Sequence, residues 1–128
     1  MRILLDTHAF LWWIDDDSQL SGQARTVITD TANELFFSAA SGWEIAIKTQ
    51  IGKLRFPPNL EQFILKQIQV NSLTVLPMHL SHTLPVYTLP VLHRDPFDRI
   101  LIAQSQIEAM PILTSDGLIG QYAVETIW

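Results

Sequence analysis

The sequence predicts an α/β fold, a three-layer α/β/α sandwich built on a mainly parallel sheet of four or five strands. Short apolar runs of strand length alternate along the chain with longer segments of helical periodicity. Such alternation is typical of strand–helix–strand units, whose strands lie parallel. Because 128 residues, 48% of them hydrophobic, suit one compact core, we expect residues 1–128 to form a single domain.

The expected strands are short apolar runs bounded by polar or turn-forming residues. Runs of this kind are typical of parallel strands that are buried on both faces. In chain order they are 2–5, 35–38, 73–76, 112–114 and, as a candidate fifth strand, the tail 124–128.

Helical periodicity fills the segments between these runs. A short helix is expected to begin near Thr7, directly after the first strand. The longer helices are expected over 21–32, 41–51, 59–70, 79–89 and 96–110.

Acidic residues stand at the ends of predicted strands and at the starts of helices. Asp6 directly follows the first strand, and Asp116 follows the fourth after one serine. Glu44 and Asp98 lie in the first turns of two predicted helices. In open α/β sheets, ligands bind beyond the carboxyl ends of the strands, where helix N-termini also point. The sequence therefore predicts that these four carboxylates meet at one edge of the sheet.

Two of these acids also have a purely structural explanation. Asp6 suits the N-cap of the helix that begins near Thr7, because its carboxylate would accept backbone N–H groups. Asp116 precedes Gly117, and an Asp-Gly pair is a common turn former. The sequence leaves both explanations open for each residue.

The other two acids fit the spacing of a capping box. Ser41 and Glu44 suit the N-cap and the third helical residue, as do Asp95 and Asp98, with Pro96 at the first helical position. Asp95 is given a structural role on this ground. Capping is served equally well by Ser, Thr or Asn, so it does not explain four acids at equivalent junctions.

Clustered carboxylates would repel one another unless a cation lay between them. The chain has no cysteine, so thiolate metal sites are excluded, and oxygen ligands favour Mg²⁺ or Mn²⁺ over zinc. The net charge of −5 argues against a nucleic-acid surface unless such a cation neutralises several acids. Without a glycine-rich phosphate loop, a carboxylate-held metal indicates phosphodiester hydrolysis by metal-activated water.

Four segments of the chain resemble the PIN-domain family and, within it, the VapC-type toxins of bacterial toxin–antitoxin pairs. The resemblance spans nearly the whole chain, and together its motifs are highly specific. They are LLDTHAFLWW at 4–13, SAASGWEIAIKTQIGKL at 38–54, LHRDPFDRILIAQS at 92–105 and LTSD at 113–116.

The resemblance implies which residues form the site. The family's catalytic and metal-binding acids correspond to Asp6 in LLDTH, Glu44 in WEIAIK, Asp98 in FDRILIA and Asp116 in LTSD. Thr7 matches a hydroxyl residue that supports the metal site, and Asp95 is an extra acid of this subgroup.

The resemblance also implies the activity and its partners. It predicts a Mg²⁺-dependent endoribonuclease toxin that cuts tRNA or ribosomal RNA and thereby inhibits translation. The partners would be RNA, a cognate antitoxin that blocks the acidic pocket, and a second copy in a homodimer or a toxin–antitoxin hetero-oligomer. The N-terminal segment has the form of neither a signal peptide nor a membrane span, so we expect a soluble, cytoplasmic protein.

Basic residues near the acids have less specific roles. Lys48 lies one turn after Glu44, so it would form an i,i+4 ion pair or hold the substrate. Arg99 and Arg94 are further candidates for binding RNA phosphate. The adjacent His93 and Arg94 are expected to form a solvated loop, which we favour over phosphate contact for this pair.

Other functions share parts of this pattern. A phosphoacceptor signalling domain would need a late lysine, yet no lysine follows Lys66, and an aspartyl phosphatase would need an Asp where His8 stands. A catalytically silent PIN-like interaction module and a PIN nuclease of RNA processing outside a toxin–antitoxin pair both stay open. Silent copies of the domain usually lose one of the acids. Because all four acids are present here, the enzyme is favoured over the silent module.

Overall fold

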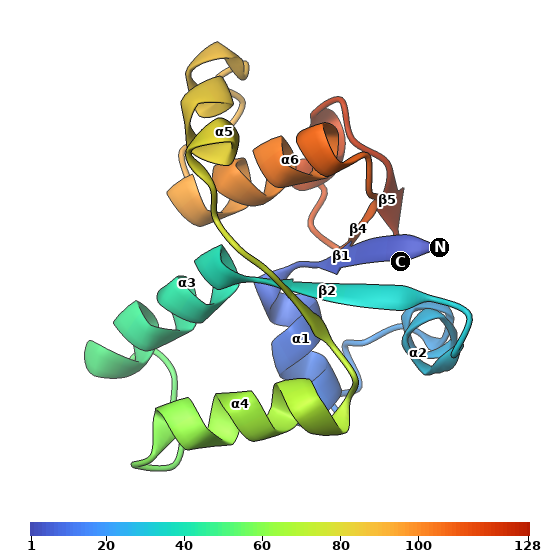
Figure 1. Ribbon diagram of the computed structural model, residues 1–128, viewed down its shortest axis with the longest axis vertical. Coiled ribbons are helices and arrows are strands. Elements are labelled where there is room, and N and C mark those ends of the chain that lie inside the picture. The colour runs from blue at the N-terminus through green and yellow to red at the C-terminus, as the bar shows by residue number, and fades with distance from the viewer.

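The computed structural model describes all of residues 1–128, and its centre is an all-parallel sheet of five strands in the order β3-β2-β1-β4-β5. The middle strand β1 (Arg2–Leu5) lies between β2 (Glu34–Ser38) and β4 (Ile112–Leu113) (Figure 1). The edges are β3 (Thr74–Leu76) and β5 (Thr126–Ile127). The predicted α/β class and parallel sheet are confirmed, as are all five expected strands, within two residues at each end.

Six α-helices and two short 3₁₀ helices connect the strands. They are α1 (Thr7–Ile14), α2 (Gly22–Thr29), α3 (Ala39–Gln50), α4 (Leu60–Val70), α5 (Leu80–Thr83), η1 (Leu84–Thr88), α6 (Pro96–Glu108) and η2 (Ile119–Gln121). None of these helices combines the length and apolarity that crossing a bilayer requires.

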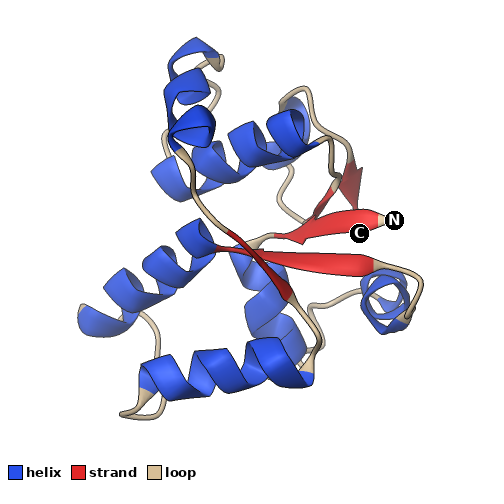
Figure 2. Cartoon of the chain, in the orientation of Figure 1, coloured by secondary structure: helices blue, strands red, loops and turns tan.

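The sheet separates two hydrophobic cores. Figure 2 shows α5 and α6 on one side of the red strands and α1, α2 and α4 on the other. Ile3 and Leu5 of β1 belong to the core that includes Phe10 of α1, whereas Leu4 belongs to the core that includes Leu101 of α6. Both faces of β1 are therefore buried, which explains why its sequence is a continuous apolar run.

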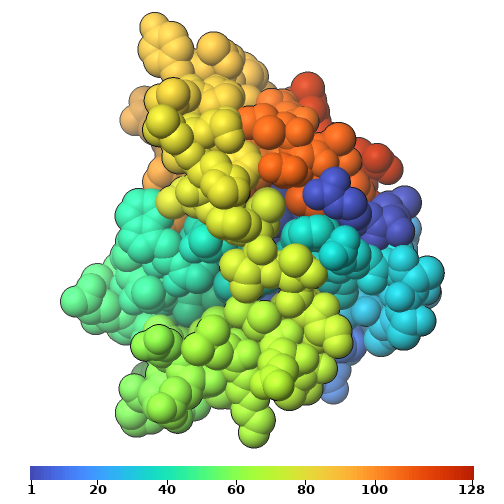
Figure 3. All heavy atoms as spheres, viewed as in Figure 1, coloured from blue at the N-terminus to red at the C-terminus, as the bar shows by residue number.

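The helix expected over 79–89 is wrong in its extent. The α-helical part is only α5, and the chain continues as the 3₁₀ helix η1, in which Pro85 occupies one of the first two positions. Proline lacks the N–H that an α-helix needs, so the ladder of hydrogen bonds cannot continue through it. In the space-filling view, the segment from α5 through η1 (yellow to gold) projects beyond α6 (orange) (Figure 3).

The predicted start of α3 is also wrong. Ser38, not Ser41, is the N-cap, and its hydroxyl accepts the backbone N–H of Ala40 at 3.0 Å. Because Ser38 is also the last residue of β2, the chain passes from strand to helix without a loop. Glu44 therefore lies in the second turn of α3, and the capping box proposed for Ser41 and Glu44 is absent.

The double role of Ser38 leads to a stability prediction. Its buried hydroxyl caps α3 and donates to Oε1 of Gln104 at 2.6 Å, whereas Ser21 only caps α2. Ser21→Ala should cost about 0.5–2 kcal/mol of unfolding free energy. Ser38→Ala should cost about 1–3 kcal/mol more, because it leaves a buried amide oxygen unpaired. Urea denaturation of both variants measures the difference, and equal losses would contradict the role given to Gln104.

Candidate acidic site at the strand ends

Neighbouring strands end at the same level of the sheet. Leu5 of β1 lies opposite both Phe37 of β2 and Leu113 of β4. Asp6 therefore leaves β1 where Thr114 leaves β4, and the backbone N–H of Asp6 donates to the carbonyl of Leu113 at 3.1 Å. This register brings side chains from distant parts of the chain to one edge, as the alternation of strands and helices predicts.

Asp6 is both a helix cap and a buried acid. Its Oδ1 accepts the backbone N–H of Ala9 at 2.6 Å, which confirms the predicted N-cap of α1. Its Oδ2 accepts the hydroxyl of Thr114 at 2.5 Å. Burial raises the pKa of Asp6, and the charge of Asp116 raises it further, although the two hydrogen bonds act in the opposite direction. The charged form of Asp6 is thus poorly compensated by the protein.

The hydroxyl of Thr114 links Asp6 to Asp116. It donates to Asp6 and accepts the backbone N–H of Asp116 at 3.0 Å. Asp116 also forms the turn expected of an Asp-Gly pair, because its Oδ1 accepts the backbone N–H of Leu118 at 2.9 Å. Asp6 therefore caps a helix and Asp116 forms a turn, and both also belong to the group of acids at this edge of the sheet.

Asp98 is the third residue of α6 and is partly buried. Burial, followed by the charge of Asp95, raises its pKa to about 6, and the charge of Asp116 contributes in the same direction. A hydrogen bond between Asp98 Oδ2 and His93 Nε2, 3.1 Å long, opposes this shift. Asp95 caps α6 as predicted, since its Oδ1 accepts the N–H groups of Phe97 and Asp98.

Glu44 and Lys48 form a largely buried ion pair on α3. Glu44 is 3% exposed, and its Oε2 lies 2.5 Å from Nζ of Lys48, which confirms the predicted i,i+4 pair. Burial alone would lower the pKa of Lys48, but the hydrogen bond to Glu44 and the charges of Glu44, Asp95 and Asp98 together raise it. Lys48 therefore lies within electrostatic reach of acids on both α3 and α6.

Three of the four acids line two neighbouring hollows, and Asp98 lines neither of them. Asp6 and Asp116 line one of about 220 Å³, whereas Glu44, Lys48 and Thr7 line another of about 230 Å³. His8 lines both hollows. Thr7 is buried and donates its hydroxyl to Ser41 Oγ at 2.9 Å, so it joins α1 to α3 rather than standing free.

The residues present fit a hard divalent cation with few protein ligands. No three Asp, Glu or His side chains stand close enough together to surround one ion. Mg²⁺, however, commonly keeps several water molecules and takes only one or two carboxylates. Asp116 is close enough to raise the pKa of both Asp6 and Asp98, so these three carboxylates share an uncompensated negative charge. The donors are all oxygen atoms, as Mg²⁺ and Mn²⁺ prefer.

The predicted basic residues are placed differently from one another. Arg94 is exposed and lines an apolar hollow of about 450 Å³ together with Trp43. The Arg99 guanidinium contacts other parts of the chain instead: Nη1 donates to the carbonyl of Pro90, in the loop before α6, at 2.8 Å and to the hydroxyl of Tyr122, which follows η2, at 3.0 Å. Lys53 and Arg55 are exposed along a hollow of about 350 Å³ next to that of Glu44.

The solvated loop expected at His93 and Arg94 is wrong for His93. Its side chain is only 9% exposed and lies between Tyr122 and Asp98. Sequence reasoning missed this contact, and the hydroxyl of Thr114, because both depend on residues far away in the chain. The pattern around His93 carried no apolar periodicity that would have indicated burial.

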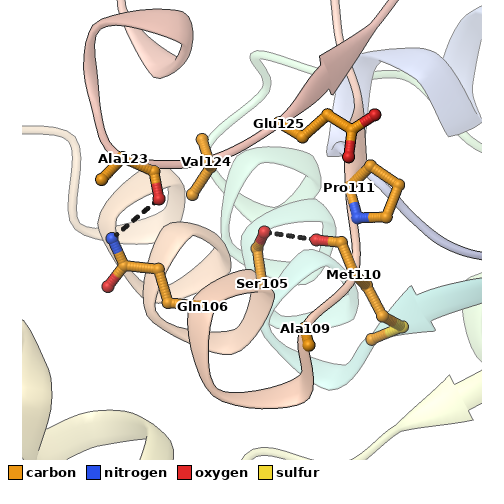
Figure 4. Close-up of a pocket in the computed structure, with 8 residues that line it drawn as sticks. All are labelled: Ser105, Gln106, Ala109, Met110, Pro111, Ala123, Val124 and Glu125. Atoms are coloured by element: carbon orange, nitrogen blue, oxygen red, sulfur yellow. Dashed lines mark hydrogen bonds between the residues drawn. The ribbon is translucent and has the colours of Figure 1, made fainter.

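A different hollow, of about 260 Å³, lies at the opposite end of β4 and contains none of the candidate residues (Figure 4). Two of its three polar side chains are already paired with backbone: Ser105 donates to the carbonyl of Met110 and Gln106 to that of Ala123. The third, Glu125, is exposed. The hollow therefore offers few free groups for recognition.

Comparisons with known proteins agree with this geometry. The family model for the PIN domain matches residues 3–125. The chain is similar to a solved structure described as the crystal structure of VapBC2 from Rickettsia felis bound to a DNA fragment from their promoter. The TM-score is 0.70 over 99% of this chain and 98% of that one, at 12% sequence identity, so the likeness concerns the fold. None of the curated proteins compared with this chain matches its sequence.

The raised pKa of Asp98 predicts how stability and cation binding depend on pH. Because its pKa is about 6 in the folded protein and 3.8 ordinarily, the stability it contributes is present below about pH 4 and lost as pH rises through 6. Asp98→Asn should therefore stabilise the cation-free protein at pH 7.5, by on the order of 1–3 kcal/mol, and have little effect at pH 4.

Thermal denaturation at several pH values, with and without Mn²⁺, measures both effects. Mn²⁺ should raise the melting temperature more at pH 7.5 than at pH 5, because protons compete with the ion for the carboxylates at the lower pH. A cation effect that is independent of pH would contradict the placement of Asp98 at the binding site.

Proposed function

This chain belongs to the PIN-domain family, and on that premise we propose that residues 1–128 form a single PIN domain that acts as a Mg²⁺-dependent endoribonuclease of the VapC type. PIN domains are typically metal-dependent nucleases. The observation that carries the proposal is the negative charge shared by the buried Asp6 and the partly buried Asp98 and Asp116 at the carboxyl ends of the strands. Such charge destabilises a fold, so its presence indicates a cationic ligand.

In this proposal one or two of Asp6, Asp98 and Asp116 bind the cation directly and the rest act through its water shell, with Mn²⁺ as a substitute for Mg²⁺. Oδ1 of Asp98 and Oδ2 of Asp116 accept no hydrogen bond from the protein, so both are free to bind it or its water shell. Thr114 and Ala9 orient the carboxylate of Asp6. Thr7 supports the site indirectly through Ser41, and Asp95 acts through its charge and its cap on α6.

A bound cation would lower the pKa of an attacking water molecule and neutralise charge on the scissile phosphate. Glu44 is the general base in this proposal, because Lys48 occupies only its Oε2 and leaves Oε1 without a hydrogen bond. Oε1 of Glu44 then accepts a proton from the attacking water. As the water oxygen bonds to phosphorus, the bond from phosphorus to the 3′ oxygen breaks and that oxygen takes up a proton from solvent. The products are a 5′-phosphate and a free 3′-hydroxyl.

Basic residues around the hollows provide the contacts for RNA phosphate. Lys53 and Arg55 line the hollow that adjoins Glu44, and Lys48 lies at the junction. Arg94 is a candidate on the opposite flank, beside the start of α6. We assign no phosphate contact to Arg99, because its guanidinium is engaged by the loop before α6. The RNA is tRNA or ribosomal RNA in this proposal, so that cleavage would inhibit translation.

The proposed partner is a cognate antitoxin. The solved structure similar to this chain is a VapBC toxin–antitoxin complex, and the likeness extends over 99% of this chain. An antitoxin that places a basic side chain over the acids would compensate the same charge that a metal ion does. We propose that the chain assembles as a homodimer, alone or within a complex with the antitoxin.

The proposal predicts cation-dependent cleavage of RNA by the purified chain freed of antitoxin. EDTA or Asp6→Asn should abolish cleavage, and Glu44→Gln should lower kcat by about 10²–10⁴-fold through loss of the base. Asp30→Asn is the matched control, because Asp30 is exposed and its amide can still accept the backbone N–H of Ala32. Sequencing of the RNA ends measures the products.

Cleavage that is undiminished in Asp6→Asn would reject the mechanism. A folded wild-type chain that cuts no RNA with Mg²⁺ or Mn²⁺, yet binds a partner protein, would instead support a silent interaction module.

A further inference from the structure

The candidate cation-binding acid Asp98 is held by a chain of hydrogen bonds that the proposed chemistry does not itself require. His93 lies between two groups: its Nδ1 is 2.8 Å from the hydroxyl of Tyr122, and its Nε2 is 3.1 Å from Oδ2 of Asp98. The His93 and Tyr122 rings meet edge to face, with centroids 5.4 Å apart. Tyr122 follows η2, so this chain joins the C-terminal part of the molecule to the start of α6.

The other contacts of Tyr122 determine which ring nitrogen of His93 carries the proton. The tyrosine hydroxyl accepts the backbone N–H of His93 at 3.3 Å and Nη1 of Arg99 at 3.0 Å. Both of these groups can only donate, so they occupy the two lone pairs of the oxygen. The remaining hydroxyl hydrogen must then point at Nδ1 of His93, which accepts it. A neutral imidazole with an accepting Nδ1 carries its hydrogen on Nε2.

We infer that His93 is a positioning residue, which donates from Nε2 to Oδ2 of Asp98 and leaves Oδ1 free to face a cation. This inference rests on the proposed function, because it assigns a purpose to the site's geometry. Carboxylates that bind metals are commonly held by such outer hydrogen bonds, and loss of the outer partner lowers metal affinity by about 10–100-fold. Tyr122 fixes the ring of His93, and Arg99 fixes Tyr122.

Arg99 strengthens this assignment because it anchors the whole loop. Besides Tyr122 and Pro90, its guanidinium donates to the carbonyls of Val86 at 3.3 Å and Leu89 at 3.4 Å. The backbone that carries His93 is thereby tied to the residue next to Asp98. A histidine that merely filled space would need neither a defined tautomer nor an anchored loop.

Two amide substitutions of His93 distinguish a side chain that positions Asp98 from one that only fills space. The amide of glutamine reaches the place of Nε2, so His93→Gln keeps a donor to Asp98. The amide of asparagine reaches only the place of Nδ1, so His93→Asn loses that donor while keeping a polar group beside Tyr122. His79→Asn is the matched control, because His79 is an exposed imidazole on a different element.

The experiment titrates Mn²⁺ into the full chain, freed of antitoxin, by calorimetry. His93→Asn should weaken Mn²⁺ binding by about 10–100-fold, and His93→Gln and His79→Asn should bind much closer to wild type. Long-range ¹H–¹⁵N NMR of the wild-type imidazoles should show His93 protonated at Nε2, whether or not a cation is present. If His93→Asn fails to fold, Tyr122→Phe takes its place, because it removes only a hydroxyl. It should broaden or shift the ¹H–¹⁵N signals of the His93 imidazole.

The possible negative results overturn different proposals. Wild-type binding in His93→Asn, or a proton on Nδ1 of His93, overturns the positioning role while leaving the proposed nuclease intact. A wild-type chain that binds no Mn²⁺ overturns the proposed function, and the positioning role with it.

Discussion

The register of β1 against its two neighbours is the constraint on which the rest of the structure depends. Leu5 is level with both Phe37 and Leu113, so the next residues of three strands, Asp6, Ser38 and Thr114, emerge at one height. Each then performs a task that needs its neighbours: a cap and buried acid, a cap joined to α6, and a hydroxyl that joins two acids. Because side chains alternate along a strand, a slip of one residue in any of these strands would turn the residue at its end toward the wrong layer.

The charged acids at this edge of the sheet destabilise the cation-free fold. Asp6 and Asp98 both have a raised pKa, mainly because burial disfavours their charged forms. A core selected for stability alone would replace them with neutral residues of similar size, and the hydrogen bonds from Thr114 and His93 only partly offset the burial. Charge retained at such a place is typical of sites that bind or react, where stability is commonly lower than it could be.

Sequence reasoning located the acids but not their supports. Alternating strands and helices place Asp6 and Asp116 after parallel strands, and parallel strands end at one edge, so their proximity follows from local patterns. The start of α3 was misplaced because Ser38 and Ser41 are equally good caps, and only the length of β2 decides between them. The burial of His93 depends on Tyr122, 29 residues away, and the position of Thr114 depends on Asp6, 108 residues away. Local periodicity carries no information about such partners.

Lys48 gives the acidic edge a resident counter-ion. Its ammonium group is bonded to Glu44 and lies within reach of the charges on Asp95 and Asp98. One positive charge that is covalently attached to the chain therefore offsets part of the repulsion among these acids, whatever ions the solution contains. The cation-free fold therefore carries less uncompensated charge at this edge than the acids alone would leave.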